Sequence, residues 1–101
     1  MNVRQLPGAT VDLEEALGYY ARISEALVDA LLAEVAAARD RIVEFPQAWH
    51  PLGNEGLRRY VLGRFPYAIV FRASPEEIVI VAYAHTRRLP RYWSSRMQED
   101  R

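Results

Sequence analysis

The residues best suited to chemistry at neutral pH are one histidine and the basic and aromatic residues that follow it. Histidine is the residue type whose ordinary pKa lies near neutrality, so the imidazole of His85 is a candidate general acid or base. Guanidinium groups grip phosphate bidentately and aromatic rings stack on bases, which makes the next segment typical of a nucleic-acid contact. Its members are Arg87, Arg88, Arg91, Tyr92 and Trp93.

The same residues also fit other roles, and the sequence leaves these open. His85 can cap the end of a strand through a hydrogen bond without taking part in any reaction. The arginines can bind an acidic protein segment, because guanidinium groups also pair bidentately with carboxylates. Trp93 can pack over the edge of a sheet as a hydrophobic cover.

Other catalytic and metal-binding patterns are missing from the sequence. It contains no cysteine, which excludes disulfides and thiolate chemistry. The second histidine, His50, follows Trp49 in a proline-rich loop, with no further ligand at metal spacing. There is no glycine-rich phosphate loop and no serine–histidine–aspartate arrangement. We therefore predict neither a metal nor a cofactor.

Charge is distributed unevenly along a chain of 101 residues whose formal net charge is zero. Residues 1–57 carry 4 arginines and 9 acidic residues, a balance of −5, and residues 58–101 carry 9 arginines and 4 acidic residues, a balance of +5. The C-terminal half is thus suited to nucleic acid or to an acidic protein segment. The longest apolar run is too short to span a membrane, and a signal peptide is not evident, so we expect a cytoplasmic protein without a membrane contact.

Two helices are predicted in the N-terminal half, after a short strand at residues 2–6. The first helix spans about residues 8–22, with acidic residues near its start that favour the helix dipole. The second has its N-cap at Ser24 and runs to about Glu44, where Pro46 ends it. Its apolar stripe consists of Val28, Leu31, Val35, Ala38, Ile42 and Phe45. The short link makes the helices an antiparallel hairpin.

Three strands are predicted in the C-terminal half. Residues 46–56 hold two prolines and two glycines and are predicted to be a loop. Strands follow at about residues 57–62, 67–72 and 78–85, and their short connections predict an antiparallel meander. The third strand is apolar on both sides, so we expect it to be the most buried. Simple alternation puts Ile78, Ile80 and Ala82 on one face and Val79, Val81 and Tyr83 on the other.

These elements predict an α+β fold in two layers, in the order β-α-α-β-β-β. The antiparallel helix hairpin packs on one face of a small antiparallel β-sheet, and the opposite face stays partly open to solvent. A chain of this length forms a single domain, residues 1–101, and its polar C-terminal tail begins at about residue 96.

The order of these motifs resembles the RelE/ParE superfamily of toxins from type II toxin–antitoxin systems, which includes plasmid stabilisation proteins. The resemblance is carried by a basic strand at 57–60, by Phe-Pro-Tyr and an apolar strand ending in Phe-Arg at 65–72, and by Ala-His-Thr-Arg-Arg-Leu-Pro-Arg-Tyr-Trp at 84–93. Residues 13–16 and 42–46 also match. The resemblance extends over about residues 3–95 and implies the same RelE/ParE-like fold.

The resemblance implies a toxin that inhibits bacterial growth and is neutralised by a cognate antitoxin in a hetero-oligomer. RelE-like members are metal-independent endoribonucleases that cut mRNA on the translating ribosome, whereas ParE-like members poison DNA gyrase and are not nucleases. We favour the ParE-like function. The RelE-like function is the alternative, together with an inactive toxin fold that only binds its antitoxin. We expect the antitoxin to contribute an acidic, partly disordered segment that folds on this protein.

Position by position, the chain retains only part of the set of residues that the resemblance assigns to the nucleases. Arg59 and Arg87 match two basic positions, but Val61 and Ala68 stand at two others. The C-terminal acid or base position falls on Trp93, whose indole cannot transfer a proton in this role, and a tyrosine lies beside it.

Two sets of site residues follow from this comparison. If the chain is a nuclease, we expect its catalytic residues to be His85, Arg59, Arg87 and Tyr92. Contacts with a target or a partner are expected from Arg58, Arg64, Arg88, Arg91 and Trp93.

Overall fold

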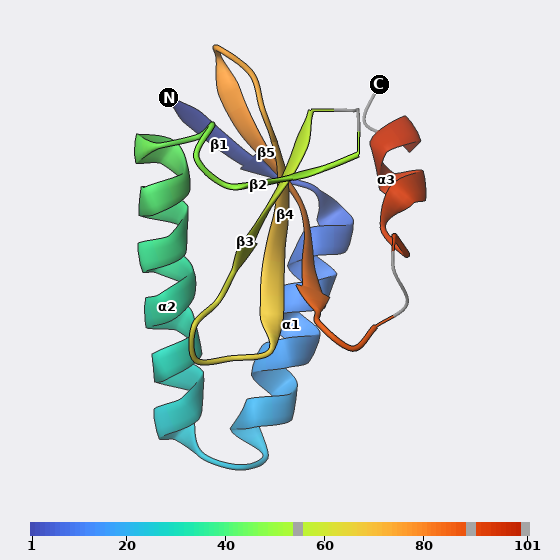
Figure 1. Ribbon diagram of the computed structural model, residues 1–101. Coiled ribbons are helices and arrows are strands. Elements are labelled where there is room, and N and C mark those ends of the chain that lie inside the picture. The colour runs from blue at the N-terminus through green and yellow to red at the C-terminus, as the bar shows by residue number, and fades with distance from the viewer. Residues whose placement is uncertain (54–55, 89–90, 100–101) are drawn as a thin grey trace.

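The chain folds into a twisted sheet with a long helical hairpin on one side and a short helix on the other (Figure 1). The computed structural model describes residues 1–53, 56–88 and 91–99. Its elements are β1 (Asn2–Gln5), α1 (Pro7–Ala21), α2 (Glu25–Glu44), β2 (His50–Leu52), β3 (Leu57–Val61), β4 (Tyr67–Ala73), β5 (Glu77–His85) and α3 (Ser94–Glu99). Apart from β2 and α3, these elements were predicted from the sequence, in this order.

The helical hairpin forms as predicted, with small changes at its ends. Proline fits the first turn of α1, because its fixed φ suits a helix and its missing N–H would have no helical partner there. At the start of α2 the Ser24 hydroxyl accepts a hydrogen bond from the N–H of Ala26 at 3.1 Å, which confirms the predicted N-cap. Phe45 was predicted to extend the apolar stripe but is 55% exposed, because α2 ends at Glu44.

The strands form one sheet in the order β1-β5-β4-β3-β2. Within the sheet β2 pairs with β3, β3 with β4 and β4 with β5, each time antiparallel. The pair of β1 and β5 at the other edge is parallel. The sheet is therefore mixed, and the prediction of a purely antiparallel sheet was wrong at this edge. The chain leaves β1 through the helical hairpin and not through a tight turn, so its connection does not require an antiparallel partner.

The segment predicted to be a loop, residues 46–56, contains the short edge strand β2. It pairs with β3 through Leu52 opposite Leu57 and His50 opposite Arg59. The strand was not predicted because proline is rare in strands. An edge strand tolerates Pro51 because it has no further neighbour that would need the missing N–H. Gly53, which follows β2 directly, has a φ of +64°, a left-handed conformation that favours glycine.

An extra residue in β5 changes which side chains face the two sides of the sheet. The register between β4 and β5 shifts so that Val81 has no partner of its own. Val81 and Ala82 consequently lie on the same face as Val79, while Tyr83 joins Ile80 on the other. Simple alternation had placed Ala82 and Tyr83 the other way round, and that prediction was wrong because a bulge offsets the alternation by one residue.

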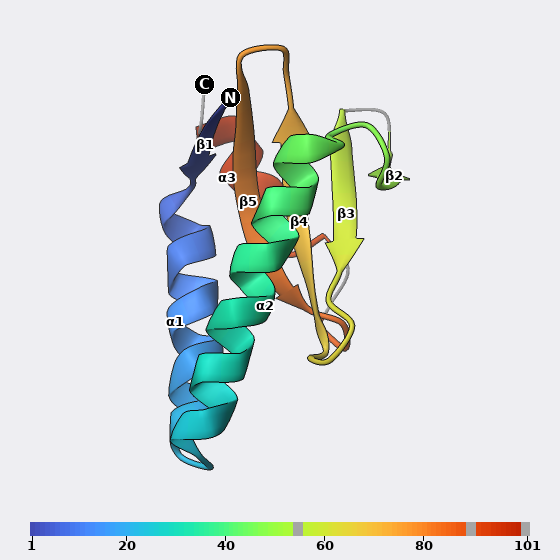
Figure 2. The same cartoon turned by 90° about the vertical axis from the view of Figure 1, so that its left-hand side faces the viewer.

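Apolar side chains pack against both faces of the sheet. The hairpin covers one face with a core that includes Leu31, Ile42 and Phe71. On the opposite face Trp93 and Met97 pack against the sheet, and Figure 2 shows α3 on the side away from α2. This face was predicted to stay partly open, and residues 96–99 were predicted to belong to a polar tail. The segment from Tyr92 through α3 covers part of the face and leaves the rest open, and residues 96–99 belong to α3 and not to a tail.

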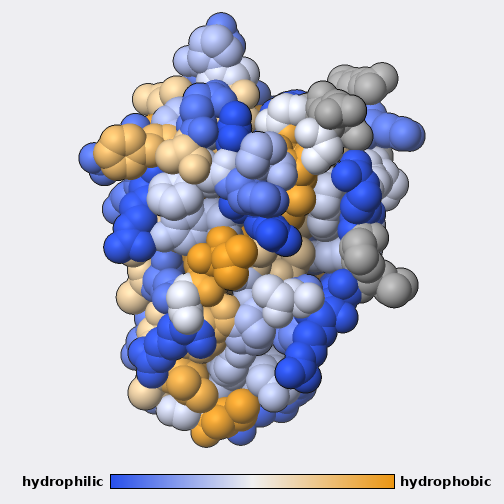
Figure 3. Space-filling model, in the orientation of Figure 1, coloured by the Kyte–Doolittle hydropathy of each residue, from blue (hydrophilic) through white to orange (hydrophobic). Residues whose placement is uncertain are grey.

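Exposed hydrophobic residues are scattered over the surface, most of them on the helical hairpin and its turn, with Val61 on the opposite face of the sheet. Figure 3 shows hydrophobic side chains among hydrophilic ones, with one group at the lower end, over the turn between α1 and α2. Ile23 in that turn is 59% exposed. None of the helices in the described part of the chain is long and apolar enough to cross a membrane.

Candidate functional site

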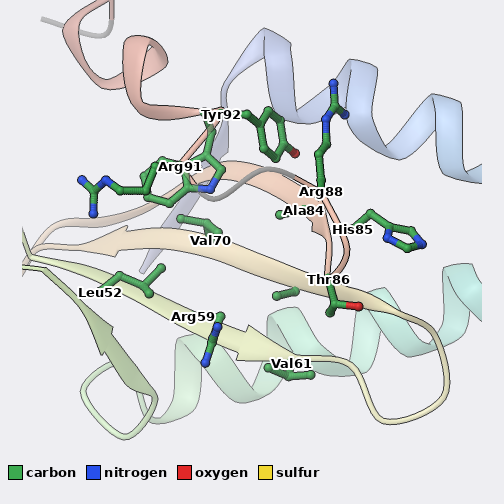
Figure 4. Close-up of a pocket in the computed structure, with 12 residues that line it drawn as sticks. Leu52, Arg59, Val61, Val70, Ala84, His85, Thr86, Arg88, Arg91 and Tyr92 are labelled. Carbon is green, nitrogen blue, oxygen red and sulfur yellow. The ribbon is translucent and has the colours of Figure 1, made fainter.

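A pocket of about 230 Å³ opens on the sheet face opposite the helical hairpin (Figure 4). It lies between the strands β3, β4 and β5 and the segment that leads into α3. It is lined by Leu52, Arg59, Val61, Ala68, Val70, Ala84, His85, Thr86, Arg88, Arg91, Tyr92 and Trp93. The pocket therefore collects most of the residues that the sequence suggested for chemistry or for binding.

The floor of the pocket follows from strand register and side-chain size. Val61, Ala68 and Ala84 are cross-strand neighbours on β3, β4 and β5, and they form one row across the sheet. Two of the three are alanines, whose short side chains leave a hollow between larger neighbours. Arg59 and Val70 form the next row on the same face. An apolar floor thus lies beside a cationic edge.

The wall of the pocket comes from the segment after β5. Trp93 is only 4% exposed and packs into the apolar cluster on this face of the sheet, which is the cover that sequence analysis allowed for it. The guanidinium carbon of Arg91 lies 5.2 Å from the centre of the Trp93 ring, and that of Arg88 lies 4.1 Å from the centre of the Tyr92 ring. Such stacking holds cations at the rim while their stems cover aromatic surface.

A buried carboxylate on α1 fixes this wall from behind. Asp12 is 5% exposed, and its Oδ2 accepts hydrogen bonds from the Tyr83 N–H at 3.1 Å and from the Tyr92 hydroxyl at 3.1 Å. Arg96 of α3 completes the cluster with its Nη1 2.7 Å from Oδ2 and its Nη2 3.1 Å from Oδ1. The acidic residues near the start of the first helix, Asp12 among them, were predicted to favour its dipole, but α1 begins at Pro7 and its first turn contains no acidic residue. Asp12 lies three residues after Ala9 and four before Ala16, both of which are buried. This helical spacing is the signal in the sequence that could have predicted its burial.

The Tyr92 hydroxyl is held in its protonated form. Burial raises the pKa of Tyr92 to about 12, and the charge of Asp12 and the hydrogen bond donated to it act in the same direction. A hydroxyl that donates to a carboxylate and ionises only at high pH is poorly placed to take up or release a proton near neutrality.

His85 is engaged at the end of β5. Its Nδ1 accepts a hydrogen bond from the backbone N–H of Arg87 at 3.1 Å, and its ring meets Tyr67 edge-on with centroids 5.1 Å apart. A neutral imidazole that accepts at Nδ1 carries its proton on Nε2. Figure 4 shows the ring turned outward from the pocket, away from Arg59 and from the Tyr92 hydroxyl. This geometry matches the strand-capping role considered for His85.

The remaining predicted site residues lie outside the pocket. Arg58 points to the other face of the sheet, where it donates to the Trp49 carbonyl at 2.8 Å and to Gln47 at 2.7 Å, so it holds the loop before β2. Arg64 lies in the turn between β3 and β4, with its guanidinium carbon 5.7 Å from the centre of the Phe65 ring. Arg87 is exposed beside the strand end. Of the four residues expected in a nuclease, the pocket is lined by all but Arg87.

No group of three or more histidine, aspartate or glutamate side chains within residues 1–53, 56–88 and 91–99 gathers closely enough to hold a metal ion. The pocket itself is an apolar hollow bordered by arginines. Such a hollow is chemically suited to a group that is partly apolar and partly anionic.

Known proteins with a similar sequence pattern and fold identify the family of this chain. The chain matches, over residues 3–90, the model of the family described as the ParE toxin of the type II toxin–antitoxin system parDE. None of the curated proteins matches it. Among solved structures, a chain of the chromosomal ParDE toxin–antitoxin system from P. aeruginosa has the same fold with a TM-score of 0.68 at 19% identity, covering 86% of this chain and 97% of that one. The resemblance seen in the sequence is thus confirmed, and the chain belongs to the family of ParE toxins of type II toxin–antitoxin systems.

Proposed function

We propose that this chain arrests bacterial growth by poisoning DNA gyrase, without cutting RNA, and that a cognate antitoxin neutralises it. Membership of the ParE toxin family supports the toxin function itself. Gyrase acts in the cytoplasm, which is where the protein would work. The arginines at the pocket rim and at the end of β5 would then serve as docking groups and not as catalysts.

The observation that carries the non-nuclease part of the proposal is the state of Tyr92. Metal-independent cleavage of RNA needs a base for the ribose hydroxyl and an acid for the leaving oxygen. Tyr92 donates its proton to Asp12 and has a pKa of about 12, and His85 already uses Nδ1 to accept from the backbone. The Tyr92 hydroxyl is therefore occupied with a structural contact, and so is one of the two ring nitrogens of His85.

The direct test uses the purified protein with DNA gyrase. We expect inhibition of supercoiling, or accumulation of cleaved DNA, at protein concentrations that leave a translated mRNA intact in a ribosome assay. Unchanged gyrase activity together with cuts in the translated mRNA would exclude the proposal.

A ribosome-dependent ribonuclease remains the second candidate, favoured by one observation. His85 and Arg59 line the same pocket, so an acid or base and a phosphate-binding group share one surface. Mapping new mRNA 5′ ends after induction of the protein alone distinguishes the two functions. Cuts in step with the reading frame support the ribonuclease, and growth arrest without such cuts supports the gyrase poison.

For neutralisation, we propose an acidic antitoxin segment that folds on the toxin within a hetero-oligomer. The +5 balance of residues 58–101 supports this charge pairing. Because exposed charges are screened by salt, the affinity of the complex should fall as the ionic strength rises. An affinity that is independent of salt would contradict the electrostatic part of the proposal.

A further inference from the structure

We propose that the pocket between β3, β4, β5 and Trp93 receives one large apolar side chain of the antitoxin, with carboxylates of the same segment pairing with the arginines at its rim. This inference rests on the proposed function insofar as the occupant is the neutralising partner. It adds which surface binds, and through which kind of side chain.

The size of the pocket favours a single side chain as the occupant. A cavity of about 150 Å³ is large enough to hold benzene, and sites for whole cofactors or drug-sized ligands occupy roughly 300–1,000 Å³. At about 230 Å³, this pocket fits one ring or one branched aliphatic group. The row formed by Val61, Ala68 and Ala84 gives that group an apolar floor.

The positive charge around the pocket favours acidic residues on either side of that apolar side chain in the antitoxin segment. Arg59, Arg88 and Arg91 line it, and the described lining includes no acidic residue. Asp12, behind the wall, is paired with Arg96. Figure 4 shows the side chains of Arg88 and Arg91 leaving the wall in different directions, Arg88 toward α1 and Arg91 toward the other side, so that cations flank the pocket.

The pocket also has the organisation of an interface hot spot. Well-packed aromatic and arginine residues around a desolvated centre are typical of the positions that dominate binding energy. Val61, on the floor at the end of β3, is 55% exposed although it is apolar. Covering it would remove apolar surface from water, which is the main driving force for association.

The test measures binding of short synthetic peptides to the intact protein by calorimetry. One peptide alternates leucine with glutamate, and matched peptides carry glutamine or lysine in place of glutamate. We expect the leucine–glutamate peptide to bind most tightly. Arg59→Glu should weaken its binding about tenfold or more, which corresponds to roughly 1.4 kcal/mol. Ala84→Leu fills the hollow from within and should weaken the binding of all three peptides.

The matched control is Arg22→Glu, which makes the same charge change on the exposed end of α1, away from the pocket. It should alter peptide binding by less than about threefold, because separated surface charges are screened. Circular dichroism and the melting temperature of each variant establish that it is folded. Equal affinity for the three peptides, or equal effects of Arg59→Glu and Arg22→Glu, would overturn the pocket as the docking site.

These outcomes are separable from the proposed function. Growth arrest and gyrase inhibition by the wild-type protein test the toxin, and the peptide measurements test the pocket. A toxic protein whose pocket shows no preference for acidic peptides would retain the function and lose this inference. A harmless protein with the expected peptide selectivity would retain the pocket and lose the function.

Discussion

The Arg96 guanidinium lies 2.7 Å from Asp12 Oδ2 and 3.0 Å from the carbonyl oxygen of Val81, so one ion pair joins α1, β5 and α3. It lies where the sheet would otherwise have an open edge. β1 pairs with β5 only from Glu77 to Ile80. Beyond that point the Val81 carbonyl and the Tyr83 N–H are bonded by Arg96 and Asp12 in place of a neighbouring strand. The pair therefore protects an edge that could otherwise recruit another chain.

Removing the carboxylate should destabilise the fold strongly. Asp12→Ala leaves the Arg96 guanidinium, the Tyr83 N–H and the Tyr92 hydroxyl without their partner. Breaking a buried pair by deleting one member costs about 3–5 kcal/mol, and Arg96 is partly exposed, so we expect about 3 kcal/mol. Urea unfolding measures this loss. Glu14→Ala, which removes an exposed carboxylate from the same helix, should change the free energy of unfolding by less than about 0.5 kcal/mol.

Two glycines of α1 offer a matched pair of substitutions. A methyl group at Gly18 meets nothing within 4 Å, so Gly18→Ala should stabilise the protein by about 0.5–1 kcal/mol through helix propensity. A methyl group at Gly8 would collide with the Arg96 guanidinium, approaching its Cζ to 2.7 Å. Gly8→Ala should therefore disturb the pair with Asp12 and lower the free energy of unfolding by about 1–2 kcal/mol, despite the same gain in propensity.

A double-mutant cycle tests the cause of the Gly8 effect. In an Arg96→Ala background the collision is absent, so Gly8→Ala should become neutral or stabilising. If Gly8→Ala remained equally destabilising without the guanidinium, the close contact between Gly8 and Arg96 would not be the reason. Thermal melts of the four proteins are sufficient for this comparison.

The sequence predicted the parts of the fold that depend on local pattern and failed where residues distant in the chain decide. Ser24 and the apolar stripe define α2 because capping and periodicity are local. β2 was missed because three residues around Pro51 carry no strand pattern. The bulge at Val81 was missed because it exists only relative to β4. Arg96, at residue separation 84 from Asp12, was assigned to a polar tail because its partner is not visible locally.

The sequence predicted which residues belong to the candidate site better than it predicted how they are arranged. His85, Arg88 and Tyr92 were selected from one contiguous segment, and the pocket contains all three. What these three side chains do in the pocket was not predictable, because it depends on which of their atoms already form hydrogen bonds within the chain. The hydrogen bond from Tyr92 to Asp12 joins residues from opposite ends of the chain.

Stability should fall at high pH, because the buried tyrosines resist ionisation. Burial raises the pKa of both Tyr83 and Tyr92 to about 12, above the value of 10.0 expected in the unfolded chain. A group whose folded pKa is raised stabilises the fold fully below the unfolded pKa and loses that contribution as the pH rises toward the folded pKa. The free energy of unfolding should therefore decrease between about pH 10 and pH 12.

The variant Tyr92→Phe tests the contribution of Tyr92 to stability apart from that of Tyr83. It removes the hydroxyl donor to Asp12, so it should lower stability at neutral pH by about 1–2 kcal/mol. The free energy of unfolding of this variant should also decline less steeply than that of the wild type in alkaline solution, because one of the tyrosines with a raised pKa is gone. Urea unfolding at several pH values, with tyrosinate absorbance followed in parallel, measures both effects. An identical alkaline slope in the two proteins would contradict the assignment to Tyr92.

Growth arrest by folded His85→Ala protein is the prediction that most directly concerns function. The imidazole accepts from the Arg87 N–H and packs against Tyr67, which are the contacts of a strand cap. Under the gyrase proposal its loss should leave gyrase inhibition within about threefold of the wild type, since no proton transfer depends on it. His50→Ala, on the exposed edge strand, is the control. Loss of toxicity by a folded His85→Ala protein, with His50→Ala fully toxic, would mean that the imidazole acts on a substrate, and the ribonuclease would then be the better account of the pocket.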